Sequence, residues 1–447
     1  MGRVEQETIY DLIVVGGGAS GLMAAGRAGE RGKKVLLLEK NKRLGEKLRI
    51  TGGGRCNILN AEPDPRILLK SYGKAEQFLY SLFSEFGMEE AKAFFESRGL
   101  PIVVQARKRA FPKSENAEDV AVVLEKYVKA GNVTVRFGSP VTKVRHEDNR
   151  ITGVMVGGKL HTAREYLFST GSVSHPETGS TGDGFEWLHE LGHTVHKPTP
   201  TIVPISVKED WSKSLAGVSL SFMKITFYVE GKKAFSEMGK VLFTHFGLSG
   251  PLILNNAHKV ADLLHDGLVT ATIDAYPHTD LGALDKQIVK IFDVSKNKTL
   301  KNVLKDFIPH GTSRGMGMLL GETIDISKKV HSVSKEERKA IGQLLKRLPL
   351  TVTGLMGFDR AVVADGGVTL DEVDTRTMRS KKAPNLFVTG DLLHINRPSG
   401  GFSLQLCWST GYVVGNNVGV TPHTPQFLLC KGGGESSRRR ILKSLLR

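Results

Sequence analysis

A short apolar run that leads directly into a glycine-rich loop restricts how the start of this chain can fold. Residues 11–15 (DLIVV) are typical of a buried strand, and residues 16–21 (GGGASG) fit the spacing GxGxxG. Gly16 allows a tight turn, Gly18 lets the backbone approach a pyrophosphate, and Gly21 lets the next helix pack closely on the strand. The N–H groups at the start of that helix would face phosphate oxygens. The pattern predicts a dinucleotide site on a parallel α/β sheet.

A second strand and an acidic residue complete this unit. The helix is expected to end near Gly32, residues 34–38 form the next strand, and Glu39 stands 18 residues after Gly21. A carboxylate at this point accepts hydrogen bonds from both ribose hydroxyls of an adenosine. The alternative is a surface Glu at a strand end, and the complete order of strand, loop, helix, strand and acid favours the adenosine.

The far end of the chain carries a second set of signals. Residues 384–388 (PNLFV) predict another buried strand that leads into TGD at residues 389–391, and GGFS at residues 400–403 opens a helix that runs to Gly415. Asp391 suits the ribityl hydroxyls of a flavin, and the helix N–H groups suit the flavin N1 and O2 edge, which gains negative charge on reduction. Alone, the glycine pair reads as a turn. The two ends of the chain together indicate FAD.

A strand in the middle of the chain is predicted to lie beside the first one. It ends in Thr170-Gly171 and follows a three-stranded meander over residues 141–163, which would bring Gly171 near the pyrophosphate. Farther on, residues 178–184 precede an amphipathic helix. Either Thr181 or Asp183 would cap that helix or contact a ligand, and both interpretations stay open.

Five stretches resemble a known family, in order, from about residue 10 to residue 419. They are residues 14–21, 50–57 (ITGGGRCN), 178–185, 242–251 (LFTHFGLSGP) and 400–411. They look like the BaiN/aminoacetone oxidase family of bacterial NAD(P)/FAD-dependent flavoproteins. The resemblance implies a two-part FAD domain interrupted by an insert made of a small β-barrel and helices. It also implies that Arg55, Cys56 and Asn57 lie beside the cofactor.

The residues of the ITGGGRCN stretch agree in kind with this implication. Three glycines before Arg55 would let backbone N–H groups and a guanidinium face phosphate or flavin. A redox role for Cys56 is the weaker alternative, because no nearby cysteine could pair with it and a small buried Cys is commoner.

The chain also departs from the family pattern. The family usually has Glu where Asp391 stands, an acidic residue where His394 stands, a basic one where Glu46 stands, Gly-Gly-Tyr-Asn where residues 400–403 stand, and Gly where Ser172 stands. The changes at His394 and Ser403 put the usual polar contacts near the flavin, and with them the usual substrate, in doubt.

The predicted architecture is α/β, with a Rossmann-like FAD domain in two parts, residues 10–196 and 351–421. Residues 197–350 form the insert, and residues 422–447 form a basic tail. Strands in the insert are expected at 201–207, 222–229 and 269–276, and helices at 283–292, 300–308 and 335–345. The insert is expected to form one wall of the substrate cleft.

The predicted cofactor contacts come from all parts of the FAD domain. They are Gly16, Gly18, Ala19, Ser20, Gly21, Glu39, Lys40, Lys47, Gly54, Arg55, Cys56, Asn57, Val141, Thr170, Gly171, Gly390, Asp391, Gly400, Gly401, Phe402 and Ser403.

No catalytic residue follows from the sequence, because flavin chemistry needs mainly orientation and charge from the protein. His175, His245 and His394 are candidate acids or bases, and each also reads as an ordinary polar or capping histidine. No second GxGxxG unit follows a strand, so NAD(P)H, if it is the donor, must bind transiently over the flavin.

Composition narrows the class further. A 40% hydrophobic content over 447 residues supports large buried cores, and three cysteines without a CxxC pair indicate a reducing compartment and no metal site. Residues 1–10 lack a signal-peptide pattern and no apolar stretch spans a bilayer, which predicts a cytoplasmic protein without a membrane partner.

The net charge of +16 and the basic tail motivate one alternative, a flavoprotein that binds or modifies RNA. It is disfavoured because no interleaved aromatic and basic motif is present. A nonenzymatic FAD-bound scaffold is a third alternative, and the oligomeric state is not predicted.

Overall fold

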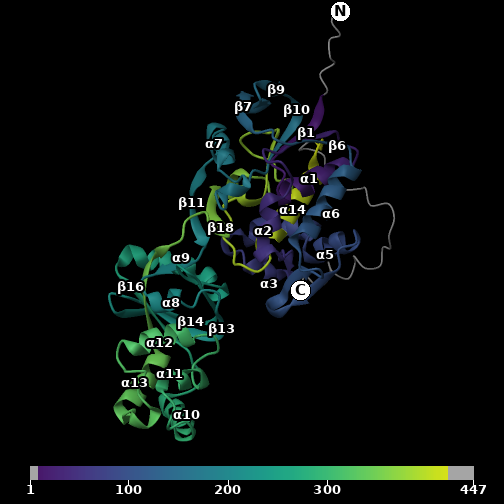
Figure 1. The fold of residues 1–447 in the computed structure, drawn as a ribbon. Coiled ribbons are helices and arrows are strands. Elements are labelled where there is room, and N and C mark those ends of the chain that lie inside the picture. Colours follow the sequence, from purple (N-terminus) through teal and green to yellow (C-terminus); the bar gives the residue numbers. More distant parts are fainter. Residues whose placement is uncertain (1–8, 421–447) are drawn as a thin grey trace, which may run out of the picture.

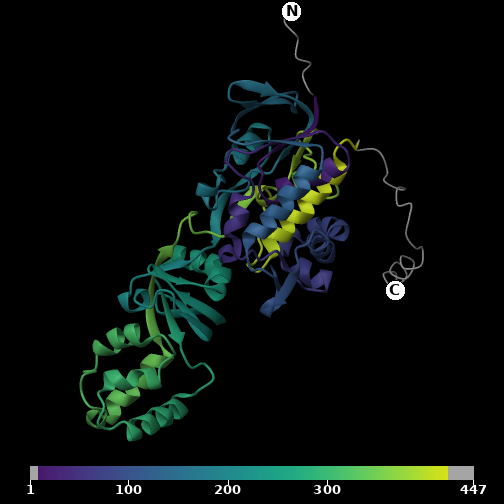
Figure 2. The same cartoon turned by 45° about the vertical axis from the view of Figure 1, so that its right-hand side comes forward.

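The computed structural model describes residues 9–420, and the predicted basic tail lies outside the described residues. The molecule is elongated (Figure 1). One part contains both ends of the described chain and a parallel sheet, and the other contains a β-barrel followed by a group of helices, as Figure 2 also shows.

The central sheet has five strands, all parallel. They are β1 (Tyr10–Val15), β2 (Val35–Leu38), β6 (Val133–Arg136), β10 (Ala163–Phe168) and β19 (Leu386–Val388). Their spatial order is β6-β2-β1-β10-β19, which is the Rossmann order 3-2-1-4-5 when the strands are counted along the chain. The last strand comes from the far end of the sequence and pairs Val388 with Phe168. The predicted fold class is therefore confirmed.

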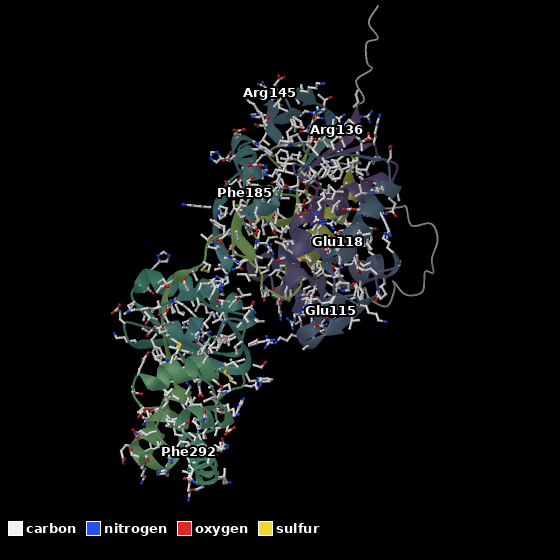
Figure 3. All side chains as sticks on the ribbon, viewed as in Figure 1. Glu115, Glu118, Arg136, Arg145, Phe185 and Phe292 are labelled. Atoms are coloured by element: carbon white, nitrogen blue, oxygen red, sulfur yellow. The ribbon has the colours of Figure 1, made fainter. Side chains whose placement is uncertain are left out.

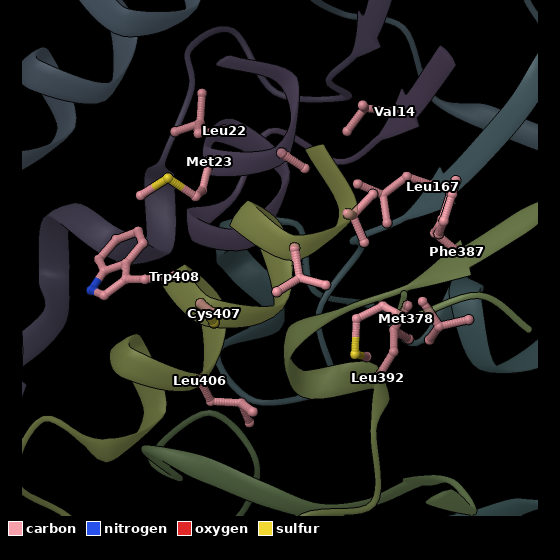
Figure 4. Close-up of a cluster of buried hydrophobic side chains, with 14 of the residues drawn as sticks. Val14, Leu22, Met23, Leu167, Met378, Phe387, Leu392, Leu406, Cys407 and Trp408 are labelled. Atoms are coloured by element: carbon pink, nitrogen blue, oxygen red, sulfur yellow. The ribbon is translucent and has the colours of Figure 1, made fainter. Parts of the chain in front are cut away.

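Helices cover this sheet. They are α1 (Ala19–Glu30), α6 (Ala117–Ala130) and α14 (Phe402–Asn417), and α14 packs along α1. Most residues of α1 are Ala, Gly or Ser, which lets α14 approach closely, and nine of the twelve residues of α1 are buried. Figure 4 shows the resulting core, where Leu22 and Met23 of α1 approach the α14 side chains around Trp408. The first and last quarters of the chain thus share one hydrophobic core.

Shorter elements fill the connections of this part. Between β2 and β6 lie α2 (Glu46–Ile50), η1 (Thr51–Gly54), β3 (Leu59–Asn60), α3 (Pro65–Lys70), η2 (Gly73–Ala75), α4 (Glu76–Glu85), α5 (Met88–Glu96), β4 (Ile102–Gln105), η3 (Ala106–Lys108) and β5 (Arg109–Pro112). Strands β3, β5 and β4 form a small sheet. The predicted meander is present as β7 (Val141–Glu147), β8 (Arg150–Val156) and β9 (Lys159–His161). After β10 come η4 (Pro176–Thr178) and α7 (Asp183–Glu190), and η7 (Leu370–Glu372) and η8 (Gly390–Leu392) flank β19.

The second part is built on a closed six-stranded barrel. Its strands are β12 (Ile205–Val207), β13 (Ser219–Val229), β14 (Lys232–Phe243), β15 (Gly247–Ser249), β16 (Val269–Asp274) and β17 (Leu348–Leu355). Its helices are α8 (Asp210–Lys213), α9 (Pro251–Asp266), α10 (Leu281–Val294), α11 (Leu300–Val303), α12 (Ser313–Gly321) and α13 (Lys335–Lys346), with η5 (Leu304–Asp306) and η6 (Val330–Ser332). This part has its own hydrophobic core, which reaches as far as Phe292 at the outer end (Figure 3).

The strand expected at residues 201–207 is wrong as a single element. The chain leaves β11 (Val195–Ile202), which pairs with β18 (Val363–Val368), and enters the barrel at β12. Pro204 lies between the two strands and has no N–H to continue a ladder. The boundaries expected at 197 and 351 fall inside β11 and β17, and the division into domains stays a prediction. Among residues 9–420, no helix is both long and apolar enough to cross a bilayer.

Candidate cofactor site and substrate cleft

A cavity opens at the carboxyl ends of β1, β2 and β10, where a Rossmann sheet binds its ligand. Many of the predicted cofactor contacts line it: Gly16, Gly18, Ala19, Ser20, Glu39, Lys40, Lys47, Val141, Thr170, Gly171, Asp391 and Ser403. The sequence motifs at the start, middle and end of the chain therefore meet at one place.

The first turn of α1 is open to this cavity. Gly18 is the N-cap residue, no side chain caps the helix and no acidic residue lies in its first turn. A Cβ at Gly18 would have no atom within 4 Å, whereas a Cβ at Gly21 would lie 2.0 Å from the Gly16 carbonyl oxygen. Gly21 is thus required by the packing of α1 on its own loop, while Gly18 faces free space. This cradle fits a pyrophosphate, which would accept hydrogen bonds from the uncapped N–H groups.

Glu39 is buried at the end of β2, with 6% of its surface exposed. The backbone N–H of Gly17 donates to Oε2 at 2.7 Å, and that of Asn41 donates to Oε1 at 2.8 Å. Burial raises the pKa of Glu39 despite these two bonds. Glu39 therefore holds the glycine loop in place in addition to facing the cavity, a role that the sequence did not indicate.

Two lysines line the cavity and differ in their partners. Lys40 Nζ donates to Thr181 Oγ1 at 2.6 Å and pairs with Asp183 Oδ2 at 2.9 Å. Lys47 Nζ has only the Ser174 hydroxyl, at 3.2 Å, and no carboxylate within 4 Å among the described residues. Burial lowers the pKa of Lys47. A partly buried ammonium without a counter-ion would suit an anionic group of a ligand.

The helix cap predicted at Thr181 or Asp183 is wrong. Helix α7 begins at Asp183, its N-cap residue is Gly182, and no side chain caps it. The two side chains bond to Lys40 and to each other instead, with Thr181 Oγ1 donating to Asp183 Oδ1 at 2.8 Å. They link α7 to the end of β2.

An unpartnered hydroxyl supports a ligand in this cavity. Thr170 Oγ1 is buried and has no hydrogen-bond partner, although the residue lines the cavity at the end of β10. A buried hydroxyl without a partner costs free energy, and a polar ligand would satisfy it. The donors and acceptors around the cavity thus fit a dinucleotide such as FAD.

Asp391 has a partner that the sequence did not reveal. In the loop after η8, the buried side chain of Arg397 forms an ion pair with Asp391, and its Nε donates to Ser403 Oγ at 3.0 Å. Arg397 thereby ties the predicted ribityl contact to the first turn of α14. A role for Asp391 toward the ribityl chain stays a prediction.

Gly401 packs closely against a neighbouring strand. A Cβ at Gly401 would lie 2.2 Å from the carbonyl carbon of Leu59 in β3. Its φ of 99° is also in the left-handed region. Gly401 is required by packing against β3. Helix α14 nevertheless begins without a side-chain cap or an acidic first turn, and Ser403 from that turn lines the cavity.

The ITGGGRCN stretch contributes to the cavity mainly through Thr51. The guanidinium of Arg55 lies 4.5 Å from the centre of the Phe111 ring and pairs with Glu115 at 3.1 Å. Cys56 is fully buried, which raises its pKa to about 12 and leaves the thiol protonated. The predicted contacts that do not line the cavity are Gly21, Gly54, Arg55, Cys56, Asn57, Gly390, Gly400, Gly401 and Phe402. Their role at the cofactor stays a prediction.

A second cavity of about 770 Å³ lies where the barrel part meets the Rossmann part. Its walls come from residues 71–75, β11, β18, η7, the first half of α9 and the loop after η8. They include Tyr72, Ile202, Leu254, Asn255, His258, Asp365, Leu370, His394, Arg397 and Pro398. Arg397 joins it to the first cavity through Asp391. Of the three candidate histidines, only His394 lines either cavity.

A dinucleotide cradle on a parallel sheet of Rossmann order, next to a separate cleft, is the arrangement of an FAD-dependent oxidoreductase, and the chain is an enzyme of this class. The model of the family described as HI0933-like protein Rossmann domain matches residues 10–417. The chain belongs to this family, as the sequence resemblance predicted.

Curated relatives match over nearly the whole chain. A 3-dehydro-bile acid delta(4,6)-reductase of Clostridium scindens is 26% identical over 417 residues, which cover 92% of this chain and 99% of the relative. A ribosomal RNA dihydrouridine synthase of Escherichia coli is 26% identical over 410 residues, which cover 92% of this chain and 98% of the relative. The solved structure of 3-ketosteroid delta1-dehydrogenase from Sterolibacterium denitrificans aligns with 92% of this chain and 99% of its own, with a TM-score of 0.49 and 14% identity.

Proposed function

We propose that this enzyme reduces a carbon–carbon double bond that is conjugated to a carbonyl group, in a small molecule bound in the second cavity. The observation that carries the proposal is the position of that cavity. The Arg397–Asp391 ion pair connects its lining to that of the cofactor cavity, and its volume suits one small molecule.

The names of the two relatives support this chemistry. A delta(4,6)-reductase of a 3-dehydro bile acid removes double bonds conjugated to a 3-oxo group, and a dihydrouridine synthase saturates the uracil double bond, which is conjugated to a ring carbonyl. The two substrates differ in size and polarity, and the reacting group is the same. This shared reacting group is what we assign to the chain.

The residues that would hold FAD follow from the first cavity. The N–H groups of α1 would bind the pyrophosphate, Glu39 would bind the adenosine ribose, and Lys47 would neutralise an anionic group. When bound and reduced, FAD supplies a hydride. The protein's own task is to bind the substrate, exclude water and provide the proton that completes the reduction.

The electron donor in this proposal is NAD(P)H, which shares the second cavity with the substrate. The described residues contain one parallel sheet of Rossmann order, and FAD would occupy its binding edge. Donor and substrate would therefore bind in turn, and O2 would compete with the substrate for the reduced cofactor.

The cofactor is tested first. The purified protein should be yellow and should release FAD on denaturation, because the cradle and Glu39 together fit an adenosine diphosphate group. Release of FMN, or a colourless protein that FAD does not reconstitute, would contradict the assignment.

The reaction is tested with the holoenzyme reduced by light under anaerobic conditions and mixed with 3-oxochola-4,6-dienoic acid or 2-cyclohexenone. We expect the flavin absorbance to return and the saturated carbon–carbon bond to appear in the product by mass spectrometry. The control is the saturated ketone with the same carbon skeleton as each probe, which should leave the flavin reduced. If neither enone reoxidises the flavin, the proposed reaction is wrong.

A second candidate is a uridine in RNA, and two observations favour it: the net charge of +16 and the name of the Escherichia coli relative. Binding to a ribosomal RNA fragment that weakens steeply with salt, with dihydrouridine formed in it, would support this candidate. Reduction of the free enones without any RNA binding would favour the small molecule.

A further inference from the structure

The second cavity contains a histidine–aspartate pair that comes from two separate elements. His394 lies in the loop after η8, where its backbone N–H donates to the Val368 carbonyl oxygen at 3.0 Å. Asp365 lies on β18. His394 Nε2 stands 3.4 Å from Asp365 Oδ1, and both residues line the cavity.

The carboxylate of this pair lacks a donor. Asp365 Oδ1 is buried and has no hydrogen bond within the described residues, because the approach of His394 at 3.4 Å is longer than a formed bond. A buried carboxylate oxygen is stabilised by a donor, and His394 Nε2 is positioned to become that donor with a small movement. In that tautomer, Nδ1 is the ring nitrogen left to exchange a proton.

The free nitrogen is available. His394 Nδ1 has no hydrogen-bond partner among residues 9–420, and about a third of the side chain, 36%, is exposed. The ring of His196 lies 4.2 Å from that of His394, which limits how the His394 ring can turn. A ring with one nitrogen facing a carboxylate and the other nitrogen free is the arrangement of a proton-transfer group.

Other charged groups face the same cavity and would influence the charge of His394. Asp365 approaches from β18 and His258 from α9, and Arg397, Lys74 and Asp371 also line the cavity. His196 of β11 does not line the cavity, but its ring lies against that of His394. Arg397 is neutralised by Asp391. The negative charge closest to His394 is therefore that of Asp365.

We propose that His394, oriented by Asp365, is the group that protonates the substrate carbon next to the carbonyl. This inference rests on the proposed function. When bound and reduced, FAD would supply a hydride, that is, two electrons and one hydrogen, to the distal carbon of the double bond. The C=C π bond breaks, and the resulting negative charge on the near carbon takes the proton from His394 Nδ1. His394 is left neutral and is reprotonated from solvent through the open side of the cavity, so that the net change is the addition of two hydrogens.

The test uses the photoreduced holoenzyme and 3-oxochola-4,6-dienoic acid as the probe. His394→Asn should slow the return of flavin absorbance by about 100-fold or more, the usual contribution of a general acid, at an unchanged half-saturating probe concentration. Added imidazole should restore part of the rate. The parent rate should fall as the pH rises, and this dependence should be absent from the variant. His245→Asn, which changes a histidine outside both cavities, should behave as the parent.

A measurement that needs no turnover tests the pair itself. In a protein labelled with nitrogen-15 at histidine, the His394 signals, assigned by their loss in His394→Asn, should show Nε2 protonated in the neutral ring, and Asp365→Asn should remove this preference. FAD content and melting temperature should match the parent in both variants. Identical spectra for the parent and Asp365→Asn would overturn the pairing.

The two hypotheses fail differently. If the probe reoxidises the parent and His394→Asn equally fast, the proton donor is another group and the proposed function stands. If the probe does not reoxidise the parent at all, the proposed function is wrong and the proton-donor assignment falls with it, whatever the nitrogen spectra show about the pair.

Discussion

Gly18 and Gly21 belong to one loop but have different neighbours, which gives a sharp test of the cofactor cradle. Gly18→Ala places a methyl group in free space at a φ of −80°, so that the apoprotein should lose about 1 kcal/mol or less. FAD affinity should fall at least tenfold, because the methyl group occupies the approach of the pyrophosphate. Equilibrium dialysis and thermal melts measure both.

Gly21→Ala is the matched control for that variant. Its Cβ would lie 2.0 Å from the Gly16 carbonyl oxygen, so that the apoprotein itself should melt at a lower temperature. A Gly18→Ala protein that keeps FAD with the parent dissociation constant would show that the pyrophosphate binds elsewhere.

The ribose-binding role predicted for Glu39 can be tested by substitution. Glu39→Gln should weaken FAD binding at least tenfold, since charge-assisted hydrogen bonds to the ribose contribute about 1.5 to 3 kcal/mol each. An unchanged dissociation constant would remove Glu39 from the site. The exposed Glu190→Gln is the control.

The raised pKa of Glu39 predicts the opposite effect on the stability of the apoprotein. A buried acid whose pKa is raised on folding binds its proton more tightly in the folded state. It therefore destabilises the fold above the raised pKa, and the penalty disappears as the pH falls through that pKa to the ordinary value near 4.5. Apo Glu39→Gln should melt at or above the parent at pH 8, and the difference should shrink at acidic pH. A variant that melts lower at pH 8 would mean that the bonds to Gly17 and Asn41 outweigh burial.

At the scale of elements, the start of α14 is the part that can tune the flavin. A variant that tests this idea must leave the fold intact. Gly401→Val does not, because Gly401 packs on β3 whether or not FAD is bound, and Ser403→Asp is therefore the better variant. A negative charge in the uncapped first turn of α14 should lower the flavin midpoint potential, since the helix terminus would stabilise the reduced anion less. Potentiometry with reference dyes measures this. Ser403→Asn is the neutral control, and equal potentials in the two variants would show that the helix does not face the ring.

The elements that could be predicted from the sequence are those whose own residues form a clear pattern of apolar side chains. Strands β1, β2, β10 and β19 each end in a short apolar run that is followed by Gly16, Glu39, Ser169 or Thr389, as expected of parallel strands covered on both faces. Strand β14 escaped prediction because exposed lysines and Gly239 interrupt its alternation. Helix α9 escaped because it starts inside a stretch recognised only as a family motif.

The site divides in the same way. Glu39 and Thr170 were predictable because local spacing places them just after strands, and Gly18 because the GxGxxG spacing places it at the start of α1. Arg397 was missed, since its ion pair with Asp391 depends on how the loop after η8 folds back. Tyr72 was missed for a similar reason, because its hydroxyl donates to the Phe402 carbonyl oxygen at 2.8 Å across 330 residues.

At the scale of the whole molecule, the proposal that NAD(P)H and the substrate share one cleft predicts the kinetic mechanism. Steady-state rates with NADPH and an enone should follow a ping-pong pattern, with parallel lines in double-reciprocal plots. High concentrations of either reactant should inhibit competitively with respect to the other. Intersecting lines would indicate that both bind at once, and a separate nicotinamide site would then have to exist.

The pairing of β19 with β10 has a consequence for how the protein is made. All strands of the barrel lie within residues 205–355, so they are translated as one continuous stretch. The free edge of β10, in contrast, has no neighbouring strand until β19 has been translated, and α1 cannot pack on α14 until that helix follows. An open strand edge is a site of aggregation. The first 170 residues therefore remain without β19 and α14 while more than half of the chain is synthesised. The cofactor cavity is completed only when α14, the last described helix, has been translated.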